Sequence, residues 1–210
     1  MNLGKFITLE GVDGAGKSTQ LKHLTTLLQQ SGLTVVSTRE PGGTDLGEQL
    51  RALLLDQSNK MHPETEALLM FAARREHLDK VIVPALRNGS WVISDRFTDA
   101  SFAYQGSGRG LSWTKLAMLE QWVQNELQPN LTLYFDVPVE IGRQRVNALR
   151  DPDRFEQEQQ EFFQRVRDGY LERAHQFPKR IRVIDAQQAV DIVKQEVASI
   201  LEPLLKNVSQ

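Results

Sequence analysis

The sequence predicts an α/β protein in which helices cover both faces of a doubly wound parallel sheet. Short runs rich in β-branched and aromatic residues recur along the chain, and longer segments with helical spacing separate them. The length of 210 residues, with 40% hydrophobic and 25% charged residues, fits one globular domain over residues 1–210.

Five runs are expected to form strands because bulky apolar residues dominate them. In chain order they are residues 5–10 (KFITLE), 34–40 (TVVSTRE), 91–95 (WVISD), 131–137 (LTLYFDV) and 181–186 (IRVIDA). Helices are expected to begin at residues that often include Ser, Pro or an acidic side chain, near Ser18, Gly47, Glu64, Ser112, Pro138, Gln157 and Ala189. Irregular structure is expected at residues 104–110 (YQGSGRG) and 147–154 (NALRDPDR).

The composition excludes several classes of protein. Lys and Arg number 25 against 27 Asp and Glu, so the formal charge of −2 gives no polybasic signature of a nucleic-acid binder. The sequence has no cysteine, which excludes disulfides and thiolate metal sites and suits a reducing compartment. No apolar run reaches the ~18 residues of a membrane span, and no signal core precedes the first strand. We therefore expect a soluble cytoplasmic protein with no membrane or nucleic-acid partner.

The segment after the first predicted strand, residues 11–18 (GVDGAGKS), satisfies the phosphate-loop pattern G-x-x-x-x-G-K-[ST]. Backbone N–H groups in such a loop face phosphate oxygens, and the following helix adds its positive N-terminal end. Lys17 is expected at the β/γ bridge of a triphosphate, and Ser18 on Mg²⁺. The predicted nucleotide-binding residues are Gly11, Val12, Asp13, Gly14, Ala15, Gly16, Lys17, Ser18 and Thr19.

The phosphate loop alone leaves three classes open: a small-molecule kinase, a GTPase switch and an ATPase. A GTPase needs the guanine-reading N-K-x-D, and the nearest string, residues 59–62 (NKMH), lacks the aspartate. An ATPase needs a hydrophobic strand that ends in Asp. The strands that precede Asp95 and Asp136 both satisfy that requirement, so the ATPase stays open on these grounds.

Arginines outside the loop favour an anionic acceptor. In the helix of residues 63–86, Arg75 interrupts an apolar stripe that includes Phe71, and a buried guanidinium needs an acceptor. A structural ion pair explains Arg75 about as well as a ligand does, but an aromatic face beside a planar donor suits a base. Arg39 and Arg96 end two predicted strands, where an ordinary turn or a solvated charge pair is the alternative to a phosphate clamp.

A charge-rich segment follows the fourth predicted strand and carries Arg143, Arg145, Arg150 and Arg154. Solvent-exposed helices are the usual explanation, and we hold it for Arg143 and Arg145. Phosphoryl transfer also needs a mobile cation that closes over the transferred group and excludes water. A short lid with arginines would provide that cation.

Together these motifs resemble the thymidylate kinase family of the bacterial type. The resemblance covers nearly the whole chain and rests on FITLEGVDGAGKSTQ, TREPGGT, LMFAARREH, VISDRF, SFAYQGSGRG, DRFEQE and VIDA. It implies the P-loop kinase fold with a five-stranded sheet of order 2-3-1-4-5, a lid at about residues 143–157, and a homodimer. It further implies phosphorylation of dTMP to dTDP by ATP with Mg²⁺. The rival within kinases is another P-loop nucleotide or deoxynucleoside kinase.

The resemblance also implies roles for individual residues. The substrate-binding set is Asp13, Arg39, Glu40, Arg51, Phe71, Arg75, Arg96, Ser101, Tyr104 and Gln105. In it Phe71 stacks on thymine, Arg75 donates to a pyrimidine carbonyl, and Tyr104 crowds the position of a ribose 2′-hydroxyl. Ser101 and Gln105 line the thymine pocket, and Arg39, Arg51 and Arg96 surround the acceptor phosphate. Asp13 contacts the 3′-hydroxyl, and Glu40 lies beside the acceptor.

The implied catalytic set is Asp13, Lys17, Arg96, Arg150 and Arg154, and the implied metal set is Ser18 and Asp95. Part of the family carries a basic residue in the phosphate loop where this sequence has Gly14. The transition-state cation is therefore expected from the lid, with Arg150 and Arg154 as candidates.

Overall fold

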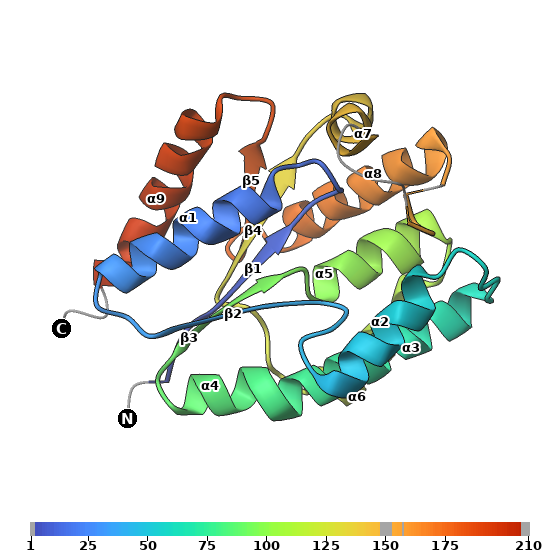
Figure 1. Cartoon of the computed structure of the whole chain (residues 1–210), viewed down its shortest axis with the longest axis horizontal. Coiled ribbons are helices and arrows are strands. Elements are labelled where there is room, and N and C mark those ends of the chain that lie inside the picture. Colours follow the sequence, from blue (N-terminus) through green and yellow to red (C-terminus); the bar gives the residue numbers. More distant parts are fainter. Residues whose placement is uncertain (1–2, 148–152, 157, 207–210) are drawn as a thin grey trace.

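The computed structural model describes residues 3–147, 153–156 and 158–206, and Figure 1 shows its sheet between layers of helices. The strands are β1 (Phe6–Glu10), β2 (Val35–Arg39), β3 (Trp91–Asp95), β4 (Leu131–Asp136) and β5 (Ile181–Asp185). Their order is β2-β3-β1-β4-β5, and every neighbouring pair is parallel. The predicted strands and the order implied by the resemblance are confirmed.

The helices are α1 (Lys17–Gln30), α2 (Asp45–Leu55), α3 (Pro63–His77), α4 (Val83–Arg87), α5 (Thr98–Ser101), α6 (Trp113–Gln124), α7 (Val139–Asn147), α8 (Gln160–Gln176) and α9 (Val190–Lys206). Two π-helical segments are η1 (Leu78–Ile82) and η2 (Phe102–Gly108). Each helix start expected from the sequence lies within three residues of an observed start. No helix in residues 3–147, 153–156 or 158–206 is long and apolar enough to cross a membrane.

Local chemistry explains the starts of two helices near the site. The Thr44 side chain accepts a hydrogen bond from the Gly47 N–H and so caps α2. At α3, Pro63 occupies the first turn, where its missing N–H costs nothing, and His62 accepts from the Glu64 N–H. Acidic residues in both first turns complement the helix dipole. These caps fix the N-terminal ends of two helices that pack against each other.

The segment of residues 104–110 differs from its expected irregular form, because residues 102–108 form η2. Its glycines serve close packing there. A Cβ atom on Gly108 would lie 2.7 Å from the Phe162 ring of α8, and η2 makes extensive contact with that helix. Glycine at this position therefore lets α8 approach the π-helix, so a loop signal in the sequence marks a buried contact.

Two apolar clusters cover the sheet. One includes Ile7, Leu9 and Phe135 and packs with α1, α8 and α9; the other includes Phe6 and Phe97 under α3 and α6. Figure 1 shows α1 and α9 side by side, and α2, α3 and α6 grouped together. Because all five strands are parallel, the chain leaves β1, β2, β3 and β4 at one edge of the sheet. The residues singled out by the sequence follow these strands.

Candidate functional site

The phosphate loop joins β1 to α1 as the motif predicts. Gly16 has a left-handed backbone (φ 90°) and starts α1 without a side-chain cap, so the first N–H groups of the helix are left for another acceptor. The buried Lys17 Nζ donates to the carbonyls of Gly11 and Val12, each at 3.0 Å. Burial, and next the charge of Arg96, lowers the pKa of Lys17. The Lys17 ammonium group therefore lies against the backbone of the loop, and the oxygens of a bound phosphate could replace these carbonyls as its acceptors.

Helix α7 closes the loop on its other side. Gly14 has φ 80°, and a Cβ atom there would lie 2.2 Å from the Gly142 carbonyl oxygen of α7. A longer side chain at Gly14 would therefore push α7 away. The Arg145 guanidinium, which sequence reasoning left to the solvent, donates to the carbonyls of Gly14 and Ala186 at 3.2 Å each. No signal in the sequence indicated this contact.

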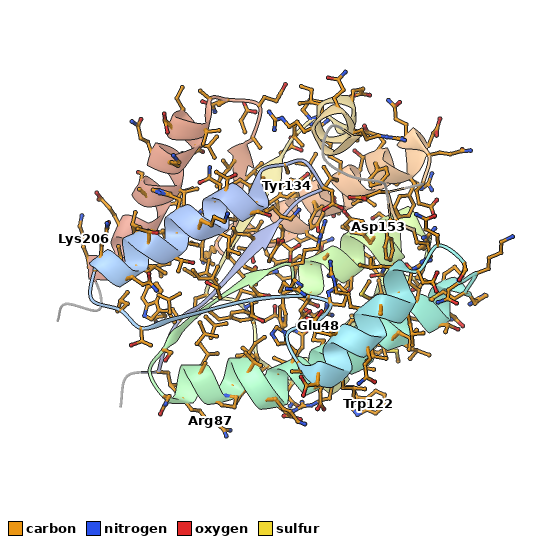
Figure 2. All side chains as sticks on the ribbon, viewed as in Figure 1. Glu48, Arg87, Trp122, Tyr134, Asp153 and Lys206 are labelled. Atoms are coloured by element: carbon orange, nitrogen blue, oxygen red, sulfur yellow. The ribbon has the colours of Figure 1, made fainter. Side chains whose placement is uncertain are left out.

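A cavity opens directly beside the loop. Its lining comes from six parts of the chain and consists of Asp13, Glu40, Pro41, Arg51, Leu55, Met70, Arg74, Arg96, Phe97, Ala100, Ser101, Tyr104, Gln105, Asp153 and Phe155. Asp13 belongs to both sites, because it lines the cavity and lies 3.8 Å from Lys17 Nζ. Figure 2 shows Asp153 near the end of this region where η2 and α8 meet. A molecule in the cavity would lie against a nucleotide on the loop.

Arg96 is the cation nearest the junction of loop and cavity. Its Nη2 donates to Asp13 Oδ1 at 2.8 Å and to the Tyr104 hydroxyl at 3.3 Å, and its buried Nε has no partner among the described residues. Burial, the largest single influence, lowers the pKa of Arg96, but Asp13, Tyr104 and other neighbouring groups together outweigh it, and the pKa lies well above its ordinary value. The guanidinium is charged and still has a donor to offer.

The backbone of Arg96 is strained, with φ 69° at a residue other than glycine. Glu10 Oε1 accepts a hydrogen bond from the next N–H, that of Phe97, at 2.8 Å, and Glu10 Oε2 accepts from the Tyr170 hydroxyl at 2.9 Å. Burial, followed by the charge of Asp99, raises the pKa of Glu10 to about 8. This buried carboxyl group holds the chain in the conformation that turns Arg96 toward the loop.

Arg74, which sequence reasoning missed, is the second buried cation of the cavity. Its Nε donates to Glu40 Oε2 at 2.7 Å, and its Nη2 donates to the Phe97 carbonyl and to Ser101 Oγ at 3.1 Å each. The guanidinium lies 4.6 Å from the centre of the Phe71 ring. Its Nη1 is buried and has no partner in the part of the chain that the structure describes. An unpartnered buried donor at a cavity indicates a ligand acceptor.

The expected placement of Arg75 and Phe71 on the acceptor cavity is wrong. Arg75 Nε donates to Asp79 at 2.9 Å and its Nη1 donates to the Val123 carbonyl, so its side chain, 43% exposed, has the structural ion pair of the alternative reading. Phe71 is buried behind Arg74 and supports that guanidinium rather than a ligand directly. Phe71 is on the buried face of α3 as the apolar stripe predicts, but the arginine on that face is Arg74 and not Arg75.

Of the two other arginines predicted at the acceptor phosphate, Arg51 lines the cavity and Arg39 does not. Arg51 lines the cavity and donates to the Pro41 carbonyl at 3.0 Å. Its pKa is lowered first by burial and then by the charges of Arg39 and Arg96, which places three cations near one another. Arg39 itself is half-exposed, pairs with Glu48 at 2.8 Å, and does not line the cavity. Its expected place on the acceptor cavity is therefore not observed.

Of the two lid candidates, the structure describes only Arg154, and its hydrogen bonds are not to the phosphate loop. Arg150 lies outside the described residues. Arg154 donates from Nε to the Leu54 carbonyl at 2.7 Å and from Nη2 to Glu66 Oε2 at 2.8 Å, and it lines a separate groove with Arg109. In this arrangement Arg154 connects the lid segment to α2 and α3. Its guanidinium has to leave these partners before it can reach a transferred phosphoryl group.

The predicted metal residues fit a magnesium ion that keeps most of its water. Asp95 Oδ1 is buried and has no hydrogen-bond partner among the described residues, and Asp95 is close enough to Lys17 to influence its pKa. Ser18 stands in the first turn of α1. Within residues 3–147, 153–156 and 158–206, no group of three His, Cys, Asp or Glu could hold a metal. This donor set suits Mg²⁺, which binds through few protein ligands plus water and phosphate.

Comparison with known proteins decides the family. The family model described as thymidylate kinase matches residues 9–197. The chain belongs to the thymidylate kinase family. A thymidylate kinase of Nitrosomonas europaea is 65% identical over 209 residues, which cover 100% of this chain and 97% of that protein. Another, of Nitrosospira multiformis, is 66% identical over 194 residues, 92% of this chain and 95% of that protein.

The fold of a solved thymidylate kinase agrees as well. The crystal structure of thymidylate kinase from Ehrlichia chaffeensis superposes with a TM-score of 0.77 at 36% identity, covering 95% of this chain and 99% of that one. The thymidylate kinase motifs used above therefore occur on the fold they require. Of the residues that the resemblance assigned to the acceptor, the structure gathers in one cavity Asp13, Glu40, Arg51, Arg96, Ser101, Tyr104 and Gln105. Their contacts with a nucleotide stay predictions.

Proposed function

We propose that this member of the thymidylate kinase family transfers the γ-phosphoryl group of ATP to dTMP and gives ADP and dTDP. The observation that carries the proposal is the shared boundary of the two sites. Asp13 and Arg96 line the cavity, while Asp13 also lies beside Lys17 of the phosphate loop. A monophosphate in the cavity would place its phosphate at Arg96, next to the donor triphosphate. Such proximity supplies most of what phosphoryl transfer needs.

Charge neutralisation completes the mechanism. Lys17 and Arg96 hold charge that spreads over the transferred group, and Mg²⁺, when bound at Ser18 and Asp95, neutralises and orients the phosphate oxygens. The acceptor phosphate is already anionic, so no general base is required. We keep residues 143–157 as the proposed lid and Arg150 and Arg154 as its proposed cations. Arg154 would exchange Glu66 and the Leu54 carbonyl for phosphate on closure.

The base end of the cavity suits thymine. Arg74 Nη1 offers a donor, Ser101 and Gln105 line the wall, and Met70 adds an apolar surface. We assign to Arg74 the role first given to Arg75, and to Tyr104 the space next to the deoxyribose. Pocket shape around one methyl group gives only ~1 to 3 kcal/mol, so slower reaction with dUMP is expected.

A coupled assay that follows ADP release with a panel of monophosphates tests this function. The highest kcat/KM is expected with dTMP, and ADP release without an acceptor is expected to be slow. Peak rates with dCMP, UMP or AMP would indicate a sibling kinase. ADP release that does not depend on any acceptor would indicate an ATPase. Equal rates with ribo- and deoxyribonucleotides would remove the role given to Tyr104.

We further propose that two copies of the chain pair through α3 and α6. Exposed apolar side chains gather there: Leu68 is 53% exposed, Met118 68% and Trp122 77%, and a groove lined by Ala67 and Leu119 lies between them. Figure 2 shows Trp122 on the outer surface of the molecule. A contiguous apolar face of this kind marks an interaction site, and a self-complementary face suits a twofold dimer.

Both nucleotides, ATP and dTMP, are water-soluble, and we propose a cytoplasmic location.

Trp122→Glu is expected to convert the dimer into a monomer, because the carboxylate would be buried without a partner against the other copy. Light scattering coupled to size-exclusion chromatography measures the mass directly. Ile192→Glu is the matched control, since Ile192 is also exposed, at 50%, but lies on α9. A monomeric mass for the unaltered protein, or a dimeric mass for Trp122→Glu, would contradict the proposed interface.

A further inference from the structure

Glu66 is a buried carboxylate that the proposed mechanism does not use. It lies on α3 and is 1% exposed. Gln105 Nε2 donates to its Oε1 at 2.8 Å, Arg154 Nη2 donates to its Oε2 at 2.8 Å, and Arg109 Nε lies 3.3 Å from both oxygens. Three side chains, two of them from η2 and its C-terminal end and one from the segment before α8, therefore meet on one carboxylate. Burying a carboxylate costs free energy unless its hydrogen-bond partners fully satisfy it. A buried carboxylate with several partners is therefore a candidate for a positioning role.

The Glu66 carboxylate fixes which way the Gln105 amide faces. A carboxylate in contact with guanidinium groups only accepts hydrogen bonds, so the NH₂ end of the amide must face Glu66. The carbonyl end, Oε1, must then face away. Gln105 lines the cavity, and its Oε1 has no hydrogen-bond partner among the described residues. The amide therefore presents an acceptor, and not a donor, for a molecule in the cavity.

Arg74 presents the opposite group to the same cavity. Its Nη1 is a buried donor without a partner in the described part of the chain, and its Nε and Nη2 are held by Glu40, Phe97 and Ser101. The cavity thus offers one fixed donor and one fixed acceptor. The imide edge of thymine or uracil offers the complement, a carbonyl oxygen at C4 beside the N3–H donor.

We propose that Glu66 is a positioning residue for base selection: by holding the Gln105 amide with its carbonyl toward the cavity, it favours thymine over cytosine. The inference rests on the proposed function, since it concerns the acceptor of that reaction. Cytosine reverses both groups, because its N3 is an acceptor and its C4 carries an amino donor. If cytosine bound in the same place, its N3 acceptor would face the Gln105 Oε1 acceptor, and its C4 amino donor would face the Arg74 Nη1 donor. Sites that hydrogen-bond a substrate reject mismatched analogues strongly.

The test is Glu66→Gln, with kcat/KM measured for dTMP and for dCMP. Glutamine keeps the shape of Glu66, but its amide can donate to Gln105 Oε1 and so allows the Gln105 amide to turn. We expect the ratio of kcat/KM for dTMP to that for dCMP to fall at least about tenfold. Glu64→Gln is the matched control, because Glu64 is on the same helix and half-exposed, and pairs with Lys115 rather than with cavity residues. It should leave the ratio unchanged.

A double-mutant cycle separates positioning from general damage. If Glu66 acts through the amide, Glu66→Gln should change the ratio in the native background and have no further effect on the ratio in a Gln105→Leu background. An equal loss of kcat/KM for both substrates would mean that Glu66 is only structural, and would overturn the inference. Wild-type protein without activity on dTMP would instead overturn the proposed function.

The orientation of the amide can also be tested without any substitution, which covers a Glu66→Gln variant that does not fold. N3-methyl-dTMP lacks the donor that Gln105 Oε1 should accept. We expect N3-methyl-dTMP to bind wild-type protein more weakly, with an inhibition constant at least about tenfold larger than the dissociation constant of dTMP. Equal binding of the two nucleotides would show that the amide carbonyl does not face the base, and the inference would fail.

Discussion

Arg96→Ala is expected to lower kcat/KM for dTMP by about 10³-fold, the loss typical of a guanidinium that stabilises a transferred phosphoryl group. Arg96 is the one side chain of the described cavity lining that also contacts both the loop residue Asp13 and the Tyr104 hydroxyl. Its unpartnered Nε leaves a donor for the acceptor phosphate. Steady-state kinetics with dTMP and ATP varied independently measures the effect.

The strained backbone of Arg96 requires a second variant. At φ 69° alanine retains the backbone cost that glycine removes, a difference of about 1 kcal/mol in folding free energy. If the guanidinium is what matters, Arg96→Gly and Arg96→Ala should lose activity equally, although Arg96→Gly should be the more stable by thermal unfolding. Arg96→Lys keeps the charge but not the planar fork, so an intermediate loss is expected.

The matched control is Arg87→Ala, because Arg87 is exposed near the end of α4, and Figure 2 shows it at the surface far from the cavity. It should leave kcat/KM unchanged. Arg96→Ala protein that folds normally and retains full catalytic efficiency would show that the acceptor phosphate is held elsewhere. Arg51, another arginine of the cavity lining and one that the charge of Arg96 influences, would be the next candidate.

The fold could be predicted closely because its three central strands, β1, β3 and β4, are almost fully buried. Strands β1, β3 and β4 read as continuous apolar runs, and the phosphate-loop motif fixes where β1 ends and α1 begins. The strand order came from the family resemblance, since periodicity says nothing of which strands are neighbours. The π-helical segment η1 follows from Pro84, which lacks the N–H that an α-helix would need at that turn.

The site was predictable where its residues are contiguous and uncertain where they depend on the rotation of a helix. Residues 11–18 form one motif, so their placement needed no tertiary information. On α3 the buried face includes Glu66, Arg74 and His77, three polar residues that weaken the apolar pattern. Ala67, Phe71 and Arg74 also have the spacing of one helical face. Alanine occurs on buried and exposed faces alike, so the sequence does not show that this face is the buried one. The pairing of Arg75 with Asp79, four residues along, was the available signal for its exposed face.

The contacts of Arg154 in the proposed lid could not be predicted from the sequence for a different reason. The lid arginines were assigned by their charge, but charge does not show which acceptor a flexible side chain chooses. Arg154 donates to Glu66 and to the Leu54 carbonyl near the end of α2, and both acceptors are distant from it in the sequence. The sequence does not show which residue pairs with a buried carboxylate in the first turn of a helix. From the sequence no role is therefore assigned to Glu66, although Glu66 contacts both Arg154 and the cavity residue Gln105.

Lys17→Met is expected to lower kcat by about 10²- to 10³-fold and to raise the KM for ATP, since it removes the cation at the β/γ bridge and keeps the length of the side chain. In the folded protein the ammonium group is bound by the carbonyls of Gly11 and Val12, which phosphate oxygens would replace. Burial already lowers the pKa of Lys17, so loss of the charge should cost little stability.

The kinetic pattern distinguishes the role of Lys17 from that of Arg96. Lys17→Met should impair acceptor-independent ADP release and transfer to dTMP alike, because the donor site is damaged, while the dissociation constant of dTMP measured by calorimetry stays nearly unchanged. Arg96→Ala should weaken dTMP binding instead. Lys22→Met is the control on the same helix, since Lys22 is exposed on α1. A Lys17→Met enzyme that bound ATP normally and lost only dTMP affinity would mean that Lys17 serves the acceptor, and that the two nucleotides lie in the opposite arrangement across Asp13.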